Sequence, residues 1–357
     1  MQISRRDWML ATSAFGAALA LAPKRLLAAD LKPVRFGIGQ KAMAPNVINC
    51  VIGEVLGFNK QEGLTVRPQA LGGNSNVQVA VDRGDVDIGI GVPSFGLPLL
   101  AKGEWNSSLN YYEYTYPYKW DIVVKPGSEI KSYQDLKGRK IGVSDFAATD
   151  YPVTKNVLKS LGIDPEKDVK FVAVGNGVPA GVALERGAID ALSYYDTGFG
   201  QIEAAGIAIS FLPRPDKLPM VGGQFLMARK ETFQSQRDML VGYGRSVCKA
   251  SQFVLADPDA GARAFLAMYP ETAPRGSGKA EAVKSILNAI SRRIKLYNPP
   301  YPDTKMGAIN ETEFQQEAAL NQLDIKDFKA FYTNALIDDI NNFDVGKIKA
   351  MASAYKG

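Results

Sequence analysis

The 357-residue sequence contains no histidine and only two cysteines. The absence of histidine excludes Ser-His-Asp and Cys-His catalysis, imidazole general bases and histidine-ligated zinc. Two cysteines are also too few for a zinc site built from thiolates. Lysine, tyrosine and carboxylate side chains could still catalyse a reaction, but no cluster of them indicates one. We therefore expect a protein that is not an enzyme and that holds no metal or other cofactor.

The apolar run near the N-terminus is short and is interrupted by polar and small residues. Met9 to Ala22 is about 14 residues, which is too short to span a bilayer comfortably. It follows Ser4-Arg5-Arg6-Asp7-Trp8-Met9, which resembles a twin-arginine export motif, and it precedes a small-residue cleavage site at Leu27-Ala28-Ala29. No cysteine stands directly after the run, so no lipoprotein anchor is indicated. We expect residues 1–29 to be a twin-arginine-type signal peptide and the mature chain to be periplasmic, with an uncleaved anchor as the alternative.

Excess charge of one sign is nearly absent from the predicted mature chain. The formal net charge is +5, but the first 29 residues supply +3 of it, from four basic residues and one acidic residue. The remaining +2 gives no electrostatic reason to expect binding to nucleic acid or to an anionic membrane. With 46% hydrophobic and 22% charged residues, the composition is that of a globular protein, long enough for two lobes.

The two cysteines leave two possibilities open. Export to an oxidising compartment would allow a disulfide between Cys50 and Cys248. Both residues fall in predicted helices, and the alternative is two separate buried thiols, because cysteine often serves as a small core residue.

A short pattern occurs twice and predicts the architecture. In Asp82 to Phe95, Gly84 ends a helix, an apolar run from Val86 to Val92 is typical of a buried parallel strand, and Pro93 begins the next helix. The segment Glu185 to Ala191 repeats this junction and leads into a strand that ends at Tyr195. The repeat predicts two similar α/β lobes.

Ligands of open α/β sheets bind outside the carboxyl ends of the strands. The loops at such ends are Gln40 to Met43, Leu71 to Asn76, Pro93 to Phe95, Ser144 to Thr149 and Gly175 to Gly177. Asn74 or Ser75, and likewise Thr149, are candidate N-caps of the helices that follow.

The aromatic stretch Leu109 to Trp120 predicts a β-strand that leads to a crossover between the lobes, where Tyr118 and Trp120 could line a cleft. A strand from Phe225 to Ala228 would return the chain to the first lobe. From Glu231 onward we expect mainly helices: Val241 to Leu255, Pro258 to Met268, Ala280 to Ile294, Glu313 to Leu320, Ile325 to Leu336 and Val345 to Tyr355.

Several motifs together resemble one family. They are Ser132 to Val143 (SYQDLKGRKIGV), Gly84 to Gly89, Gly162 to Pro165 and Gly187 to Ala191. Over residues 33 to 270 the chain resembles the NitT/TauT-like, or SsuA/THI5-like (NMT1-like), branch of the type II solute-binding proteins of ABC transporters. The resemblance implies a type II periplasmic binding protein fold with two α/β lobes, a two-crossover hinge and a ligand trapped by closure. It also implies delivery of the solute to a membrane permease with its ATPase.

In this family's terms we expect residues 30–120 to form the first part of lobe 1 and residues 121–219 to form lobe 2. Residues 220–357 would return to lobe 1 and add a helical extension, in a chain that we expect to be monomeric. The family often has Gly-Ser-Thr in the loop where this chain has Ala147-Ala148-Thr149, flanked by Asp145 and Asp150. These two carboxylates oppose anion binding at the helix N-terminus, so nitrate or a simple sulfonate is less favoured than for the family at large. The aromatic residues Phe95, Tyr118, Trp120, Phe146 and Tyr195 favour a larger organic solute. An aromatic solute or an organic acid or sulfonate would fit this expectation.

The candidate ligand-binding residues are Gln40, Lys41, Asn74, Ser75, Ser94, Phe95, Tyr118, Trp120, Phe146, Thr149, Asn176, Tyr195 and Asp196. Four of them also have a plainer interpretation. Asp196 could cap the helix after its strand, Asn74 and Asn176 could form turns, and Lys41 could be solvated. Other functions are a sensory binding protein that reports to a membrane receptor, and a THI5-like enzyme, whose implied chemistry needs a histidine and a Cys-rich motif that are absent here. A LysR-type effector domain shares the architecture, but no helix-turn-helix precedes it.

Overall fold

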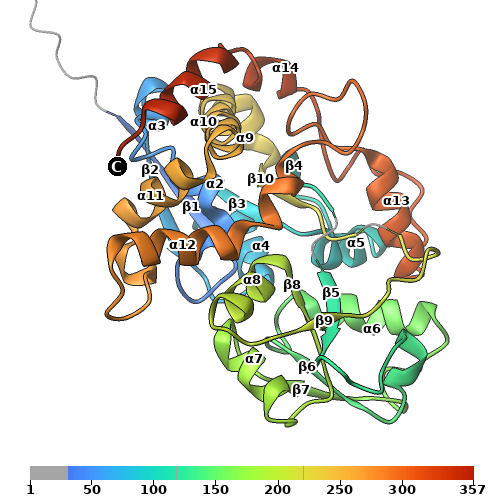
Figure 1. Ribbon diagram of the computed structural model, residues 1–357. Coiled ribbons are helices and arrows are strands. Elements are labelled where there is room, and N and C mark those ends of the chain that lie inside the picture. The colour runs from blue at the N-terminus through green and yellow to red at the C-terminus, as the bar shows by residue number, and fades with distance from the viewer. Residues whose placement is uncertain (1–30, 118–119, 220) are drawn as a thin grey trace, which may run out of the picture. The chain divides into compact units, whose positions relative to one another are not determined.

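The computed structural model describes residues 31–117, 120–219 and 221–357 (Figure 1). The predicted signal peptide and Tyr118 lie outside these residues. Lys32–Gly357 form one compact unit, which contains two five-stranded sheets. No helix within the described ranges combines the length and the hydropathy needed to cross a bilayer.

The first sheet has the strand order β2-β1-β3-β10-β4. Strand β1 pairs in parallel with β2 and β3, whereas β10 is antiparallel to both β3 and β4. Strand β2 lies at the sheet edge, where its Pro68 is tolerated because proline has no N–H to donate to a ladder. The strands are β1 (Lys32–Ile38), β2 (Leu64–Ala70), β3 (Ile88–Gly91), β4 (Ser108–Thr115) and β10 (Gln224–Arg229).

The second sheet repeats this arrangement with the order β7-β6-β8-β5-β9. Its parallel strands are β6, β7 and β8, and β5 is antiparallel to β8 and β9. The chain passes from the first sheet to the second between β4 and β5, and it returns between β9 and β10. The strands are β5 (Trp120–Val124), β6 (Lys140–Val143), β7 (Lys170–Ala173), β8 (Ala191–Tyr195) and β9 (Ser210–Phe211).

Both copies of the helix-glycine-strand junction form as the sequence predicts. Helix α4 (Asn74–Arg83) ends at Gly84, with φ of 76°, and helix α7 (Val178–Glu185) is followed by Gly187, with φ of 72°. Positive φ favours glycine because a Cβ atom would clash there. Helix α5 (Pro93–Ala101) begins at Pro93, directly after β3.

The remaining helices cover the two sheets. In Figure 1, α10, α11 and α12 lie around β1 to β3, while α6 and α7 flank β6 to β8. Helix α10 buries most of its length, and its Tyr243 ring lies 5.3 Å from that of Phe36 in β1. These helices are α2 (Ile48–Val51), α3 (Phe58–Gln61), α6 (Asp150–Ser160), α8 (Asp196–Ala204), α9 (Lys230–Ser235), α10 (Arg237–Ala256), α11 (Pro258–Met268), α12 (Lys279–Ile290), α13 (Glu311–Leu320), α14 (Ile337–Ile340) and α15 (Val345–Ala354), with 3-10 turns η1 (Pro45–Val47), η2 (Tyr133–Leu136), η3 (Pro270–Thr272) and η4 (Arg293–Tyr297).

One predicted helix is wrong. The segment from Ile325 to Leu336 runs along the outer edge of β4 instead, where Asn110 and Tyr332 form an isolated parallel bridge. The amide of Asn110 donates to the carbonyl of Phe331, and the amide of Thr333 donates to the carbonyl of Asn110. The outer edge of β4 has backbone N–H and C=O groups without a neighbouring strand. An extended segment can pair with these groups, whereas a helix in the same place would leave them unpaired.

The structure decides two further predictions. The helix predicted around Cys50 is broken into the short pieces η1, α2 and α3. Between α2 and α3, Gly53 packs against Ser246 of α10, and its carbonyl accepts from the amide of Asn59. Cys50 and Cys248 are both buried and free, which confirms two separate thiols. Burial raises the pKa of each thiol, to about 12 for Cys248, so neither is a reactive thiolate near neutral pH.

Candidate ligand-binding site

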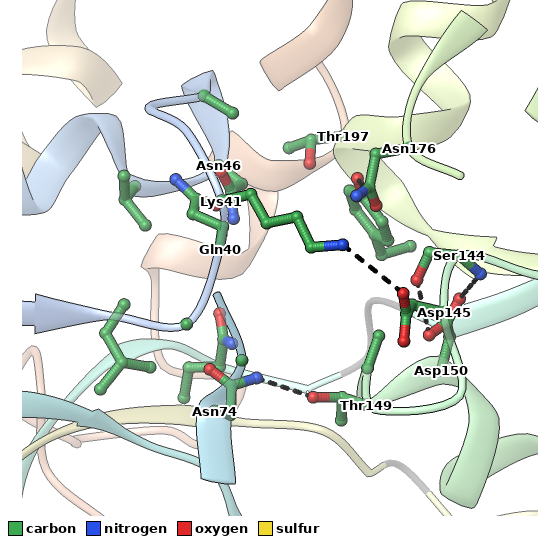
Figure 2. A pocket seen from close by; sticks show the side chains of 18 of the residues that line it. Gln40, Lys41, Asn46, Asn74, Ser144, Asp145, Thr149, Asp150, Asn176 and Thr197 are labelled. Atoms are coloured by element: carbon green, nitrogen blue, oxygen red, sulfur yellow. Dashed lines mark hydrogen bonds and ion pairs between the residues drawn. The ribbon is translucent and has the colours of Figure 1, made fainter. Parts of the chain in front are cut away.

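A cavity of about 300 Å³ lies where loops of both sheets meet (Figure 2). Its walls come from the loops after β1 and before α4 on one side, and from the loops after β6 and β7 on the other. These loops follow the carboxyl ends of parallel strands, which is where open α/β sheets bind ligands. The volume is at the lower end of the range for small-molecule pockets.

The wall from the first sheet is made mainly of amides. Gln40 and Lys41 follow β1, Asn46 lies in η1, Asn74 begins α4, and Gln224 begins β10. Buried amide atoms on this wall, Gln40 Nε2 and Asn46 Oδ1, have no hydrogen-bond partner among the described residues. Buried polar atoms without partners are costly, so these two are positioned to bond a solute.

The wall from the second sheet is made of hydroxyls and carboxylates. Ser144, Asp145, Thr149 and Asp150 come from the loop after β6, and Asn176 comes from the loop after β7. The backbone of this second loop is held by Tyr194, whose hydroxyl accepts from the amide of Gly177 and donates to the carbonyl of Gly175.

Two polar contacts connect the walls at the positions seen in Figure 2. Asn74 Nδ2 donates to Thr149 Oγ1 at 2.8 Å, and Lys41 Nζ lies 3.7 Å from Asp145 Oδ2. The sequence predicts capping roles for Asn74 or Ser75 and for Thr149. Instead Gly73 is the N-cap of α4, and Thr149 occupies the N-cap position of α6 without a capping hydrogen bond. Both side chains are directed across the cavity instead of along their own helices.

Arg293 lines one side of the cavity and forms a buried ion pair with Asp196, which lies behind it. Arg293 Nε and Nη2 donate to the two carboxylate oxygens of Asp196 at 2.6 and 2.5 Å, and Nη1 donates to the carbonyl of Asn46 at 2.7 Å. Burial alone would lower the pKa of Arg293, but the nearby carboxylate of Asp196 outweighs it and raises that pKa. The pair joins α8 to η4, and Gly200 lets the backbones of α8 and α12 approach closely beside it.

Asp150 is the other buried carboxylate of the site. Its oxygens accept from the amide of Ser144 at 2.5 Å and from the Ser144 hydroxyl at 2.8 Å. Burial raises the pKa of Asp150 to about 6, although the hydrogen bonds from Ser144 and from the first turn of α6 oppose the rise. Asp150 is therefore mostly ionised at neutral pH and protonated in mild acid.

Aromatic side chains complete the lining. The rings of Trp120 and Tyr195 meet edge to face with centroids 5.9 Å apart, and the Tyr195 hydroxyl donates to Asn176 Oδ1 at 3.3 Å. On the opposite wall the Tyr114 hydroxyl donates to Gln224 Oε1. Rings held in this way provide flat apolar surface for an organic solute.

The structure brings seven of the predicted site residues together around the cavity: Gln40, Lys41, Asn74, Trp120, Thr149, Asn176 and Tyr195. Five others lie outside its lining. Ser94 and Phe95 belong to the first turn of α5, and Phe95 packs against the core of the first sheet. Ser75 is exposed on α4, and Phe146 is exposed and packs on Tyr151. Asp196 neither lines the cavity nor caps α8 with its side chain, because Arg293 occupies its carboxylate.

Sequence reasoning missed several lining residues, including Asn46, Thr197, Gln201, Gln224 and Arg293. Ser144 and Gln224 lie at ends of predicted strands, so their positions carried a usable signal. Arg293 lies almost a hundred residues after Asp196 at the start of a helical turn, and no local pattern marks it.

Comparison with known proteins supports this architecture. The sequence profile described as "NMT1/THI5 like" matches residues 44–261, more than half of the chain. Searching curated proteins gave no match. Many solved structures match, among them three that share less than a quarter of their residues with this chain, so their likeness concerns the fold.

A protein from Bordetella bronchiseptica RB50 is 24% identical, with a TM-score of 0.62 over 87% of this chain and 96% of its own. The periplasmic aliphatic sulphonate binding protein SsuA from Escherichia coli is 16% identical, with a TM-score of 0.61 over 89% and 99%. The alkanesulfonate-binding protein SsuA from Xanthomonas axonopodis pv. citri, bound to MOPS, is 14% identical, with a TM-score of 0.57 over 86% and 97%. The predicted two-lobed periplasmic binding protein fold is confirmed, and the chain belongs to the NMT1/THI5-like family.

Proposed function

We propose that this protein is the periplasmic solute-binding component of an ABC importer. It captures a small organic solute between its two lobes and delivers it to a membrane permease that works with an ATPase. The twin-arginine-like segment at the N-terminus is the proposed export signal. Solved structures of the same fold include periplasmic sulfonate-binding proteins.

The observation that carries the proposal is the cavity between two walls of different origin. Side chains from the loop after β1 and from the start of α4 meet side chains of the loop after β6, through Lys41 and Asp145 and through Asn74 and Thr149. A solute that contacts both walls favours the state in which they are close, so binding energy drives closure. The cavity lining contains neither cysteine, and the sequence has no histidine, so a histidine base or a cysteine nucleophile is excluded at this site.

Thermal melting of the mature protein, from Asp30 onward, against a panel of small compounds tests the proposal. The panel contains amines, neutral amides and alcohols, carboxylates, sulfonates and pyrimidines. A ligand at about a hundred times its dissociation constant should stabilise the protein by roughly 2.7 kcal/mol. We expect stabilisation by one chemical class, confirmed by calorimetry at one site per chain.

A pair of matched variants ties the ligand to the cavity. Asn176→Ala removes a lining amide, whereas Asn106→Ala removes an exposed amide outside the lining. We expect only the first to weaken binding, by a few-fold to tenfold for one lost hydrogen bond. Failure of every class to bind, with no ligand retained in denatured protein by mass spectrometry, would contradict the proposed function.

A further inference from the structure

Helix α12 and the turn η4 are built into the lobe of the first sheet. Ile290 of α12 and Tyr297 of η4 are buried in the hydrophobic core around that sheet. The amide of Tyr116, which follows β4, donates to the carbonyl of Leu296 in η4 at 2.8 Å. Any movement of the first lobe therefore carries α12 and η4 with it.

Helix α8 belongs to the second lobe but packs against α12 (Figure 1). Phe199 and Ile202 of α8 are buried in the core of the second lobe. Gly200 faces α12, and a Cβ atom on it would lie 2.3 Å from the carbonyl oxygen of Asn288 and 2.7 Å from the Cα atom of Ala289. The two helix backbones are thus in direct contact, which glycine permits because it has no side chain.

Ion pairs secure this contact near both ends of α8. At its start, Asp196 forms the buried pair with Arg293 of η4. Near its end, the two carboxylate oxygens of Glu203 accept from Arg292 at 2.6 and 2.9 Å. The Arg292 guanidinium also lies 5.0 Å from the centre of the Phe211 ring in β9. Helix α8 is therefore held in both position and direction against α12 and η4.

A second attachment between the lobes lies beside the return crossover. Helix α13 belongs to the first lobe, where the rings of Phe314 and Phe225 pack with centroids 5.2 Å apart. Leu320, at the end of α13, packs against the core of the second lobe. Glu317 of α13 accepts from the amide of Gly222, which lies between β9 and β10, at 3.2 Å. The second lobe is thus attached at α8 and again near α13.

The loops at the cavity edge meet through contacts of a weaker kind. They are the hydrogen bond between Asn74 and Thr149 and the exposed ion pair of Lys41 and Asp145. Separating a side-chain hydrogen bond or an exposed ion pair costs little, because water replaces the lost partner. This edge can therefore open more easily than the contact of α8 with α12.

We infer that the contact of α8 with α12 is part of the hinge, and that the lobes open by rotation about a line from this contact to α13 and the return crossover. A body attached at two places is free to rotate only about the line that joins them. Such a rotation parts the loops after β1 and β6, while α8 and α12 stay together. The inference goes beyond the proposed function, because it gives the C-terminal helices a role that does not depend on which solute binds.

Distances between pairs of spin labels in the ligand-free protein test the inference. One pair, Ala204→Cys with Lys284→Cys, spans α8 and α12, and the other, Ser75→Cys with Phe146→Cys, spans the loop edge. All four positions are exposed, and the two buried native cysteines are replaced by alanine in both proteins. The mature protein is refolded from urea before labelling, so that any retained solute is removed.

We expect a single narrow distance distribution for the α8–α12 pair and a broader one, extending to longer distances, for the loop pair. An α8–α12 distribution as broad as that of the loop pair would overturn the inference, and so would narrow distributions for both pairs. No solute takes part in this measurement. Its outcome is therefore separate from that of the melting panel, which tests the proposed function.

Matched glycine variants then test the contact itself. Gly200→Ala places a methyl group against the backbone of α12, whereas Gly278→Ala, directly before α12, places one in open space. The α8–α12 label distance should grow by about 1 Å in Gly200→Ala, because the added atom must move from 2.3 Å to an ordinary contact of about 3.5 Å. It should stay the same in Gly278→Ala. An unchanged distance in Gly200→Ala would contradict the direct contact, and the measurement with Gly200 intact decides the inference if that variant fails to fold.

Discussion

Two ion pairs near the cavity differ in burial and in hydrogen-bond geometry, the two properties that decide how much an ion pair contributes to stability. Asp196 and Arg293 are 5% and 2% exposed and share two short hydrogen bonds. Lys41 and Asp145 are 73% and 47% exposed and lie 3.7 Å apart. The first pair is a fixed joint between α8 and η4, and the second is a loose contact at the outer edge. Each pair joins one basic and one acidic side chain, so the two pairs differ in burial and geometry and not in the kind of charges that they join.

Burial also makes the first pair vulnerable in a way that the second is not. A buried pair contributes little against a well-packed apolar replacement, but breaking it leaves a charge that cannot reach water. An exposed pair that is broken simply returns to solvent. Substitutions at the two pairs should therefore differ widely in effect, with the largest loss at the buried one and the smallest at the exposed one.

Removing Arg293 should have the largest effect. Arg293→Met leaves the carboxylate of Asp196 buried without its partner and frees the carbonyl of Asn46. We expect the free energy of unfolding to fall by about 3–5 kcal/mol, measured by urea denaturation at pH 7.5. The double variant Arg293→Met with Asp196→Leu removes both charges and should recover much of that loss. Equal stability of the single and double variants would show that the lost packing, and not the unpaired charge, is responsible.

A buried pair of like charge gives the converse test. Glu113 of β4 and Glu313 of α13 are both buried, and a Cβ atom on Gly223 would lie 2.3 Å from Glu113 Oε1 and 3.3 Å from Glu313 Oε2. Burial raises the pKa of both carboxyl groups, and the charge of Glu313 raises the pKa of Glu113 further. The folded chain therefore keeps protons that the unfolded chain has released. Stability should fall as the pH rises from the ordinary glutamate value of 4.5 through the raised values.

Glu113→Gln should remove part of this dependence. The slope of unfolding free energy against pH should become less negative by up to about 1.4 kcal/mol per pH unit, because one fewer proton is released on unfolding. Glu104→Gln, at an exposed position, is the matched control and should leave the slope unchanged. An identical pH slope in Glu113→Gln and the unmodified protein would refute the expectation.

The sequence allowed much of the fold to be predicted, because local chemistry determines it. Gly84 and Gly187 mark helix ends through positive φ, and the strand that follows each of them is predicted from a short apolar run. The predicted helix at Ile325 to Leu336 was wrong because its backbone pairs with Asn110, more than two hundred residues earlier. A local pattern carries no information about such a partner.

The site shows the same limit. Gln40, Asn74, Thr149 and Asn176 line the cavity, and each lies in or directly after a loop that was predicted to follow a strand. Ser94 and Phe95 come from a predicted loop too, but they belong to the first turn of α5 and lie outside the lining. Asp196 follows a strand in the same way, yet it is withdrawn from the cavity by Arg293. Which polar residue faces a solute and which faces another part of the chain depends on contacts between distant segments, and these appear only in the folded structure.

The hydrogen bond between Asn74 and Thr149 should have an intermediate effect, and only on the closed state. Asn74→Ala and Thr149→Val each remove one partner of the 2.8 Å contact. We expect each to cost about 0.5–1.5 kcal/mol of ligand binding, or roughly twofold to tenfold in affinity, for a ligand identified in the melting panel. Calorimetry on both single variants and the double variant gives the coupling energy. Additive losses would mean that the two side chains act on the ligand separately.

Lys41 should have the smallest effect on stability and the most informative effect on ligand charge. Lys41→Gln removes an exposed ammonium, so the free energy of unfolding should change by less than about 1 kcal/mol, and less still at high salt. The variant leaves Asp145 without its counter-ion at the edge of the cavity. A cationic solute should therefore bind a few-fold more tightly and an anionic one a few-fold more weakly, with both changes fading as salt is added. Weaker binding of a cationic ligand in Lys41→Gln would show that Lys41 supports the cavity by contact instead of by charge. In that case the exposed pair, like the buried one, would act by holding two parts of the structure together.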